Sequence, residues 1–310
     1  MITKNVVNTD KWGECLEIKN EKAELLISLD FGPRALSYKL KEGKNVFFED
    51  PERTVYFDDP SIGEYYKDRD IWYNFGGHRL WINPEKMPQT FHPDIDKVTY
   101  ELTENGAIVY QKRQVPNELE LSIEFIMDEA EAKLKVIHRV KNTADTANEF
   151  AIWCISPMAP GGMLIVPMGE LEDGAAPNRS FATWPYTDLT DPRLYIGKNF
   201  LTLLQEPGNT YNPVNLGYNN PLGVAGYLNN GTLFIDRFDC IDGGNYPDRG
   251  SAFETYSDEN FMEVESLGEL KAVQPGETVE HVENWELVNA ADTFEPRDEE
   301  TMRVFAEKYM

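Results

Sequence analysis

One stretch of the chain alternates strictly between apolar and polar side chains: Leu119-Glu120-Leu121-Ser122-Ile123-Glu124-Phe125. Residues 133–140 alternate in the same way, and Asn142-Thr143-Ala144-Asp145 then turns the chain. A period of two is typical of a β-strand that packs one face on a core and turns the other toward solvent or a ligand. The two stretches therefore predict β-strands at the centre of the fold.

Strand signals continue on both sides of these stretches. Asn-Gly pairs at 105–106 and 230–231 are strong hairpin signals. The other runs that indicate strands are residues 23–29, 34–40, 96–103, 107–112, 223–228, 232–236, 261–267 and 278–287. Many antiparallel strands joined by short hairpins favour an all-β sandwich, which we predict as a single domain over residues 1–310.

The C-terminal tail carries the clearest helix signal. Met302, Phe305, Ala306 and Tyr309 recur at i, i+3, i+4 and i+7. This spacing predicts an amphipathic helix over about 296–309 that packs on the outside of a sheet. In contrast, residues 157–221 are rich in Pro, Gly and Asn, and we expect long loops there over one end of the sheets.

Composition excludes several classes of protein. Apolar residues make up 41% of the chain, which is enough for a full core and excludes disorder as a class. The 54 acidic and 29 basic residues give a net charge of −25. This charge argues against nucleic acid or an anionic membrane as a partner and suits a neutral or cationic ligand.

No apolar run approaches the roughly 18–20 residues of a membrane span, and the N-terminal residues show no apolar signal segment. We therefore expect a cytoplasmic protein. The three cysteines, Cys15, Cys154 and Cys240, form no CxxC pair or zinc pattern and are expected as buried thiols. The sequence carries no signal for an oligomeric state.

Three motifs follow one another along the chain. They are Gly76-Gly77-His78-Arg79-Leu80-Trp81 with Trp72 before it, residues 153–162 beginning at Trp153, and residues 261–268 with Glu263 and Glu265. Together and in this order they resemble the galactose-mutarotase-like superfamily, in particular aldose 1-epimerase-like bacterial proteins with a GGH-[RK]-LW signature. The resemblance implies an all-β, two-sheet antiparallel supersandwich whose concave sheet binds a sugar.

The first motif offers chemistry of its own. Glycines at 76 and 77 allow positive φ or a close backbone approach. His78 is a candidate acid or base, and Arg79 offers fixed donors for hydroxyl or carboxylate oxygens. Trp72 and Trp81 supply flat apolar faces that suit a pyranose ring. The alternative is a glycine-bracketed bend with His78 hydrogen-bonded in the core.

The third motif places two carboxylates on one strand. Glu263 and Glu265 share a face with Cα atoms about 7 Å apart, and Met262 and Val264 point to the core. At the floor of a cleft, burial and mutual repulsion would raise their pKa values into the range of a general base. A solvated acidic face is the alternative. The resemblance implies a Glu base, for which Glu263 fits best by position and Glu265 second.

The family's second His, a general acid, is missing from residues 154–158, so His78 takes the acid role, facing Glu263 across a shared hollow. His138 could be buried or point into the cleft, and His281 is expected at the surface. The remaining candidates for sugar contact are Trp153, Trp184, Asp236 and Arg237, for which core packing or a surface ion pair is the alternative.

The resulting prediction is a carbohydrate-binding protein for a small sugar or an oligosaccharide, with aldose 1-epimerase-like activity. Interconversion of anomers needs only a base and an acid, so no metal or cofactor is required. Two other classes stay open, a non-catalytic sugar-binding module and a glycoside hydrolase or lyase on the same fold. The scattered histidines predict no metal site, although calcium at residues 239–244 stays open.

Overall fold

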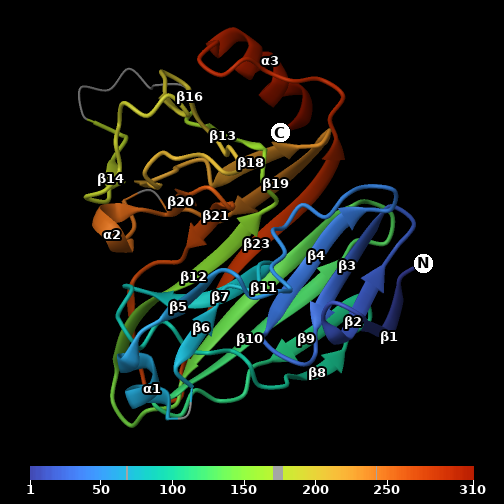
Figure 1. The fold of residues 1–310 in the computed structure, drawn as a ribbon, viewed down its shortest axis with the longest axis vertical. Helices are drawn as coiled ribbons and strands as arrows, with labels where there is room; N and C mark the ends of the chain where they lie inside the picture. Colours follow the sequence, from blue (N-terminus) through green and yellow to red (C-terminus); the bar gives the residue numbers. More distant parts are fainter. Residues whose placement is uncertain (68, 170–176, 242) are drawn as a thin grey trace.

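The computed structural model describes residues 1–310 except residues 68, 170–176 and 242. Two large sheets face each other and enclose the core (Figure 1). The eleven-stranded sheet contains, in spatial order, β1 (Thr3–Thr9), β2 (Gly13–Lys19), β3 (Ala23–Ser28), β4 (Arg34–Leu40), β7 (His78–Asn83), β12 (Asn148–Met158), β21 (Met262–Leu267), β20 (Phe253–Ser257), β17 (Val214–Tyr218) and β14 (Phe181–Thr183), with β22 (Lys271–Val273) paired to β12.

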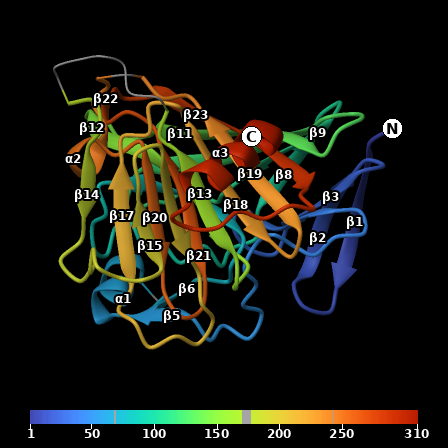
Figure 2. The same ribbon diagram turned by 90° about the horizontal axis from the view of Figure 1, so that it is seen from above.

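The ten-stranded sheet contains, in spatial order, β15 (Leu194–Ile196), β16 (Phe200–Leu204), β13 (Met163–Pro167), β18 (Val224–Asn229), β19 (Thr232–Phe238), β23 (Thr278–Asn289), β11 (Lys133–Asn142), β10 (Leu119–Met127), β9 (Gly106–Tyr110) and β8 (Thr99–Leu102). A third, small sheet pairs β5 (Tyr56–Asp58) with β6 (Ile71–Tyr73). Short helical segments are α1 (Pro60–Tyr66) and α2 (Pro247–Gly250). Figure 2 shows α1, β5 and β6 gathered on one side of the molecule.

Period-two alternation builds the core, as the sequence predicts. The apolar side chains of β10 at Leu121, Ile123 and Phe125 are buried between the sheets. Trp285 of β23 is 1% exposed and contacts aromatic rings from both sheets, among them Tyr38 of β4. The predicted all-β two-sheet architecture is therefore confirmed.

Both predicted Asn-Gly hairpins are present. Asn230 and Gly231 have φ values of 50° and 75° and join β18 to β19. Two consecutive positive φ values are typical of the tight type I′ turn, whose twist matches that of the flanking strands. Asn105 and Gly106 likewise lie where β8 turns into β9.

The expectation of long loops over residues 157–221 is wrong in part, because several short stretches of that segment are strands. The segment forms β13, β14, β15, β16 and β17, which complete the ends of both large sheets, and residues 170–176 lie outside the described part of the chain. The physical reason is that short apolar runs, such as the five residues of β16, lie between Pro and Gly turns. Turn residues dominate the composition there although the runs between them pair as strands.

The predicted C-terminal helix is α3 (Glu299–Tyr309), which begins three residues later than expected. Asp298 caps it by accepting hydrogen bonds from the backbone N–H groups of Glu300 and Thr301. Met302 and Phe305 are buried against apolar side chains on the outer face of the ten-stranded sheet. Figure 1 shows the helix at one end of the molecule. Among the described residues, no helix is long and apolar enough to span a membrane.

Replacing Phe305, which is 2% exposed, by alanine is expected to lower the free energy of unfolding by about 3–5 kcal/mol, because the substitution leaves a cavity under α3. Urea unfolding followed by circular dichroism measures this change. Val304→Ala is the matched control, since Val304 is 52% exposed and its loss should change stability by less than about 0.5 kcal/mol. Equal losses in the two variants would show that α3 does not pack as described.

Candidate functional site

The twin glycines set the position of β7. Gly76 and Gly77 have φ values of +81° and +70°, and a Cβ atom on either would lie 2.1 Å from the carbonyl oxygen of Phe48 or 2.3 Å from that of Ala35. Only glycine allows both the backbone conformation and this close approach. The first strand residue after the turn is His78, which is paired with Ala35 of β4.

Alternation along β7 then sends successive side chains to opposite faces of the sheet. Arg79, Trp81 and Asn83 line a cavity on the face turned away from the second sheet, and Leu80 lies in the core. His78 has the same phase as Leu80. The sequence motif therefore divides into two groups of residues with different surroundings.

The cavity has a volume of about 640 Å³ and lies over the neighbouring strands from β7 to β17 of the eleven-stranded sheet. β7 provides Arg79 and Trp81, β12 provides Trp153, and β21 provides Glu263 and Glu265. Trp153 is the register partner of Trp81, so the two indoles lie side by side with ring centroids 5.6 Å apart.

Aromatic side chains from other segments close the cavity. Trp72 of β6 lies against Trp81 with a centroid distance of 5.2 Å, and Phe57 of β5 borders the opening. Trp184 and the half-exposed Tyr186 line another part of the wall. A cavity of this size with aromatic walls and a few buried polar groups is typical of small-molecule sites.

Arg79 is held in the cavity by charge and by aromatic faces. Its Nη2 donates to Glu263 Oε1 at 2.8 Å, and its guanidinium carbon lies 4.6 Å from the Trp81 ring centroid and 5.3 Å from that of Trp72. The side chains of Arg79 and Glu263 are 5% and 11% exposed, so this ion pair is shielded from water. A shielded pair is strongly coupled, because removing one partner leaves a buried charge.

The two carboxylates predicted on β21 lie in the cavity but have different partners. Burial raises the pKa of Glu263, and the charge and hydrogen bond of Arg79 counteract that rise. Burial raises the pKa of Glu265 well above its ordinary value, and the negative charge of Glu263 adds to the rise. Glu265 Oε2 accepts only the indole N–H of Trp153 at 2.6 Å among the hydrogen bonds of the described residues. Glu263 is therefore the residue more easily ionised.

Further acidic residues that the sequence reasoning did not select also belong to this site. Glu85, Asp248 and Asp258 line the cavity, and Glu254 is the register partner of Glu265. The sequence did contain a signal for Asn83 and Glu85, because both follow the end of the first motif, at intervals of two from Trp81. Asp248 and Glu254 are separated from that motif by a long stretch of chain: Glu254 is brought to the site by the sheet pairing of β20, and Asp248 by the α2 segment, where it accepts a hydrogen bond from Asn83.

The predicted position of His78 is wrong. His78 is fully buried between the sheets, with Nδ1 2.9 Å from Ser156 Oγ and Nε2 2.7 Å from His138 Nε2. It does not line the cavity and does not face Glu263 across it. The physical reason is strand alternation, because the residue next to Arg79 must point to the opposite face. Burial lowers the pKa of His78 well below its ordinary value.

The hydrogen bonds of His138 assign the tautomers. His138 Nδ1 lies 3.2 Å from the carbonyl oxygen of His281, which can only accept, so that nitrogen carries the proton. His138 Nε2 is then an acceptor for the N–H of His78 Nε2, and His78 Nδ1 accepts from the Ser156 hydroxyl.

The predicted surface position of His281 is also wrong. His281 is 6% exposed, and its Nε2 lies 2.8 Å from Ser266 Oγ.

His78, His138 and Glu283 bring ligand atoms within 4.8 Å of one another, which is the spacing of a metal site. The ring centroids of the two histidines are 4.9 Å apart, close to the 2.7 Å separation of the nitrogens plus a ring radius on each side. The Nε2 atoms therefore point at one another. This geometry fits an N–H···N hydrogen bond and does not direct two lone pairs at one ion.

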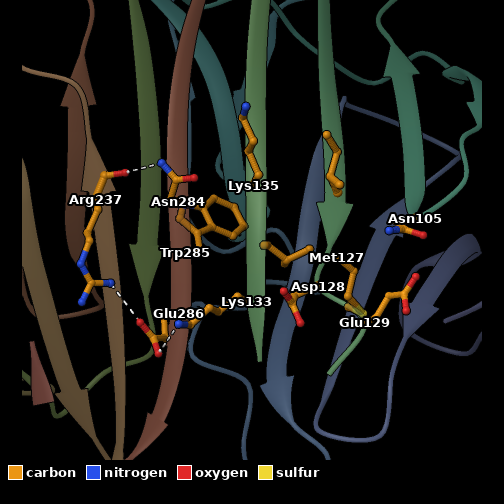
Figure 3. Close-up of a pocket in the computed structure, with 12 residues that line it drawn as sticks. Asn105, Met127, Asp128, Glu129, Lys133, Lys135, Arg237, Asn284, Trp285 and Glu286 are labelled. Carbon is orange, nitrogen blue, oxygen red and sulfur yellow. Dashed lines mark hydrogen bonds and ion pairs between the residues drawn. The ribbon is translucent and has the colours of Figure 1, made fainter. Parts of the chain in front are cut away.

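Asp236 and Arg237 are likewise not in the cavity, which corrects their predicted role as sugar contacts. Asp236 is 2% exposed, and burial together with the charge of Glu283 raises its pKa well above the ordinary value. Arg237 lies on the outer face of the ten-stranded sheet, where it pairs with Glu286 at 3.0 Å in a separate shallow groove (Figure 3). The two residues are neighbours on β19, so their side chains point to opposite faces, and neither face is that of the cavity.

The remaining predicted residues have these positions. Trp72, Trp81, Trp153, Trp184, Arg79, Glu263 and Glu265 all line the cavity. Their roles in binding or catalysis stay predictions. Cys15 and Cys154 are buried as expected, and Cys240 is partly exposed. The possible calcium loop at 239–244 includes residue 242, which lies outside the described residues.

The Arg79–Glu263 ion pair generates a pH-dependent prediction. Arg79→Met should lower the free energy of unfolding by about 3–5 kcal/mol at pH 8, because Glu263 is left ionised and buried without a partner. Without Arg79 the pKa of Glu263 rises further, so at lower pH the carboxyl takes up a proton and the loss becomes smaller. Urea unfolding at several pH values measures the effect.

The double variant R79M/E263Q is the control, since it removes both charges and should recover most of the lost stability across the pH range. A loss in R79M that does not change with pH, or no recovery in the double variant, would contradict the coupling described here.

The similarity of this chain to known proteins lies in its fold. No protein-family profile matches the chain, and no curated protein matches it. Among solved structures, this chain is similar to a provisionally named aldose 1-epimerase from Klebsiella pneumoniae. The match covers 99% of this chain and 86% of that protein's chain, with a TM-score of 0.61 and 11% identity. This chain is also similar to a galactose mutarotase-like protein from Lactobacillus casei. The match covers 88% of this chain and 100% of that protein's chain, with a TM-score of 0.50 and 14% identity.

A TPR-domain containing protein from Parabacteroides distasonis matches 92% of this chain with a TM-score of 0.60 and 15% identity. This chain spans only 50% of that protein's length. Likeness at such low identity is informative about the fold and leaves activity to be argued from the site. The chain therefore has the two-sheet antiparallel sandwich fold of galactose mutarotase-like proteins.

Proposed function

We propose that the cavity binds a sugar and that Glu263 and Glu265 interconvert its anomers, an aldose 1-epimerase reaction. One observation carries the proposal: two carboxyl groups on one strand differ in their tendency to ionise and lie in a cavity walled by tryptophans. Aromatic faces suit the apolar face of a pyranose. Two titratable groups with pKa values set apart by their surroundings indicate a base and an acid.

In the proposed reaction, the Glu263 carboxylate accepts the proton of the anomeric hydroxyl, because Arg79 favours its ionised form. The protonated Glu265 carboxyl donates its proton to the ring oxygen as the bond between C1 and that oxygen breaks. The open-chain aldehyde rotates about its C1–C2 bond. The ring oxygen then attacks the other face of C1, returns its proton to Glu265, and the new hydroxyl receives the proton held by Glu263.

This assignment replaces His78 as the acid. Among the described residues, no histidine lines the cavity, so the proton donor must come from another residue type. The same observation favours a second candidate function, a sugar-binding module without catalysis. The two candidates differ in one measurable respect, since a binding module would be stabilised by sugars and would leave the rate of anomer exchange unchanged.

Polarimetry of freshly dissolved α-glucose or α-galactose tests the reaction. The wild-type protein should accelerate the approach to the equilibrium rotation, and Glu263→Gln and Glu265→Gln should each lower the rate enhancement by about 10²-fold or more. Lys135→Ala is the control, because Lys135 is exposed on the outer face of the ten-stranded sheet and should not affect the rate. Full enhancement in both Glu variants would overturn the assignment.

The rate should also depend on pH. The reaction needs Glu263 ionised and Glu265 protonated, so the rate should rise as Glu263 loses its proton and fall as Glu265 does. Because both pKa values are raised, both limbs of the bell should lie above the ordinary carboxyl range near about pH 4.3. Initial polarimetric rates from acidic to alkaline pH measure the profile, and a rate that does not vary with pH would contradict the mechanism.

A further inference from the structure

Negative charge is in large excess at the cavity. Five acidic residues line it, namely Glu85, Asp248, Asp258, Glu263 and Glu265. Arg79 is the only cationic residue among the lining residues that the structure describes, and it is already paired with Glu263. Beyond this pair, none of the described lining residues is a cation that could balance the remaining carboxylates.

Three of the lining residues, Glu85, Asp248 and Glu265, lie near the buried Glu254, and we call these four residues the acidic corner. Glu254 is paired with Glu265 in the β20–β21 register, so two acidic side chains lie opposite each other on adjacent strands. Two carboxylates placed directly opposite repel each other, and burial together with this repulsion raises the pKa of both groups well above the ordinary value. Selection for stability alone gives no reason to keep this arrangement.

An unsatisfied polar atom at the acidic corner also points to a ligand. Asn83 lines the cavity and is 1% exposed; its Nδ2 donates to Asp248 Oδ2 at 2.6 Å, whereas its Oδ1 has no partner among the described residues. Glu254 does not itself line the cavity, so Asn83 Oδ1 is the unsatisfied acceptor that a ligand there would meet. A buried acceptor without a donor is costly, and a ligand that carries N–H groups would satisfy it.

The acidic corner does not have the spacing of a metal site. Within the described ranges, the only group of residues whose ligand atoms converge closely enough to share an ion is the His78–His138–Glu283 cluster between the sheets. Glu85, Asp248 and Glu265 line a roomy cavity that also carries indole rings. This arrangement suits an organic cation with an apolar body better than a bare ion.

Protonation behaviour agrees with an excess of negative charge. Burial raises the pKa of Glu85, and the charges of Glu263 and Asp248 raise it further. Burial also raises the pKa of Glu254 well above its ordinary value, and the charge of Glu265 adds to the rise. A bound positive charge would stabilise the ionised forms and release protons.

We infer that the sugar of this site is cationic, an amino sugar whose protonated amine lies at the acidic corner. This inference rests on the proposed function, because it names the class of sugar for the same cavity. The ammonium group donates to the carboxylates of Asp248 and Glu85 and to Asn83 Oδ1, while the ring packs on the tryptophan walls and Glu265 keeps its proton. An N-acetylated sugar has the same ring without the charge and should lose these contacts.

Isothermal titration calorimetry at about pH 6.5, where the amine is protonated, tests the inference with three matched ligands: glucosamine, N-acetylglucosamine and glucose. Glucosamine should bind about tenfold or more tightly than either neutral sugar. Asp248→Asn and Glu254→Gln should each reduce this preference several-fold. Glu131→Gln removes one charge from an exposed position far from the cavity and should leave the preference unchanged.

The outcomes separate the two proposals. Equal affinities for glucosamine and glucose would overturn the cationic-sugar inference and leave sugar binding intact. If no sugar binds, the proposed function itself fails. A preference for glucosamine that is equally reduced by Glu131→Gln would also overturn the inference, since general attraction to the protein's net charge would then explain it. Binding of calcium at the corner without glucosamine binding would overturn it in favour of a metal.

Discussion

The strict alternation of side chains along β7 is the constraint on which the site depends. Gly76 and Gly77 bring the chain so close to Phe48 and Ala35 that the phase of the strand is fixed where it begins. Arg79 is thereby sent into the cavity, where it neutralises Glu263 across the width of β12. A shift of one residue would bury the guanidinium between the sheets and turn an imidazole toward the cavity.

The same phase gives His78 a role in joining the two sheets. Its ring links Ser156 of the eleven-stranded sheet to His138 of the ten-stranded sheet. Nearby, Ser266 donates to Glu283 at 2.6 Å and makes a second polar link between the sheets. Polar groups inside a core are tolerated when their hydrogen bonds are made, and such a network favours one relative position of the two sheets. The floor of the cavity is therefore supported from beneath by directional bonds as well as by apolar packing.

Much of the fold could be predicted from the sequence because strand periodicity is local. The alternation of residues 119–125, both Asn-Gly hairpins and the shared face of Glu263 and Glu265 depend only on neighbouring residues, and all appear in the structure. The prediction for His78 failed for a related reason. It treated adjacent residues of one motif as members of one site, although the period of a strand separates them. Glu254 and Asp248 could not be found, because the β20–β21 pairing places Glu254 and the tertiary position of α2 places Asp248.

The acidic corner is not explained by stability. An opposed pair of buried carboxyls and unpartnered acceptors reduce the stability of the unliganded protein, as is common where a site is arranged for a ligand. The sandwich tolerates this because its core, centred on Trp285, lies on the other side of the sheet. The core and the proposed ligand site thus lie on opposite faces of the same strands.

Six tryptophans allow a direct test of where a sugar binds. Four of them line the cavity, whereas Trp285 lies in the core with its indole N–H donated to Glu283 and Trp12 donates to Glu49. In a ¹⁵N-resolved NMR titration with glucosamine, the account predicts that the indole signals of Trp72, Trp81, Trp153 and Trp184 shift, while those of Trp285 and Trp12 stay in place. Shifts confined to Trp285 or Trp12, or no shift at any indole at saturating sugar, would contradict it.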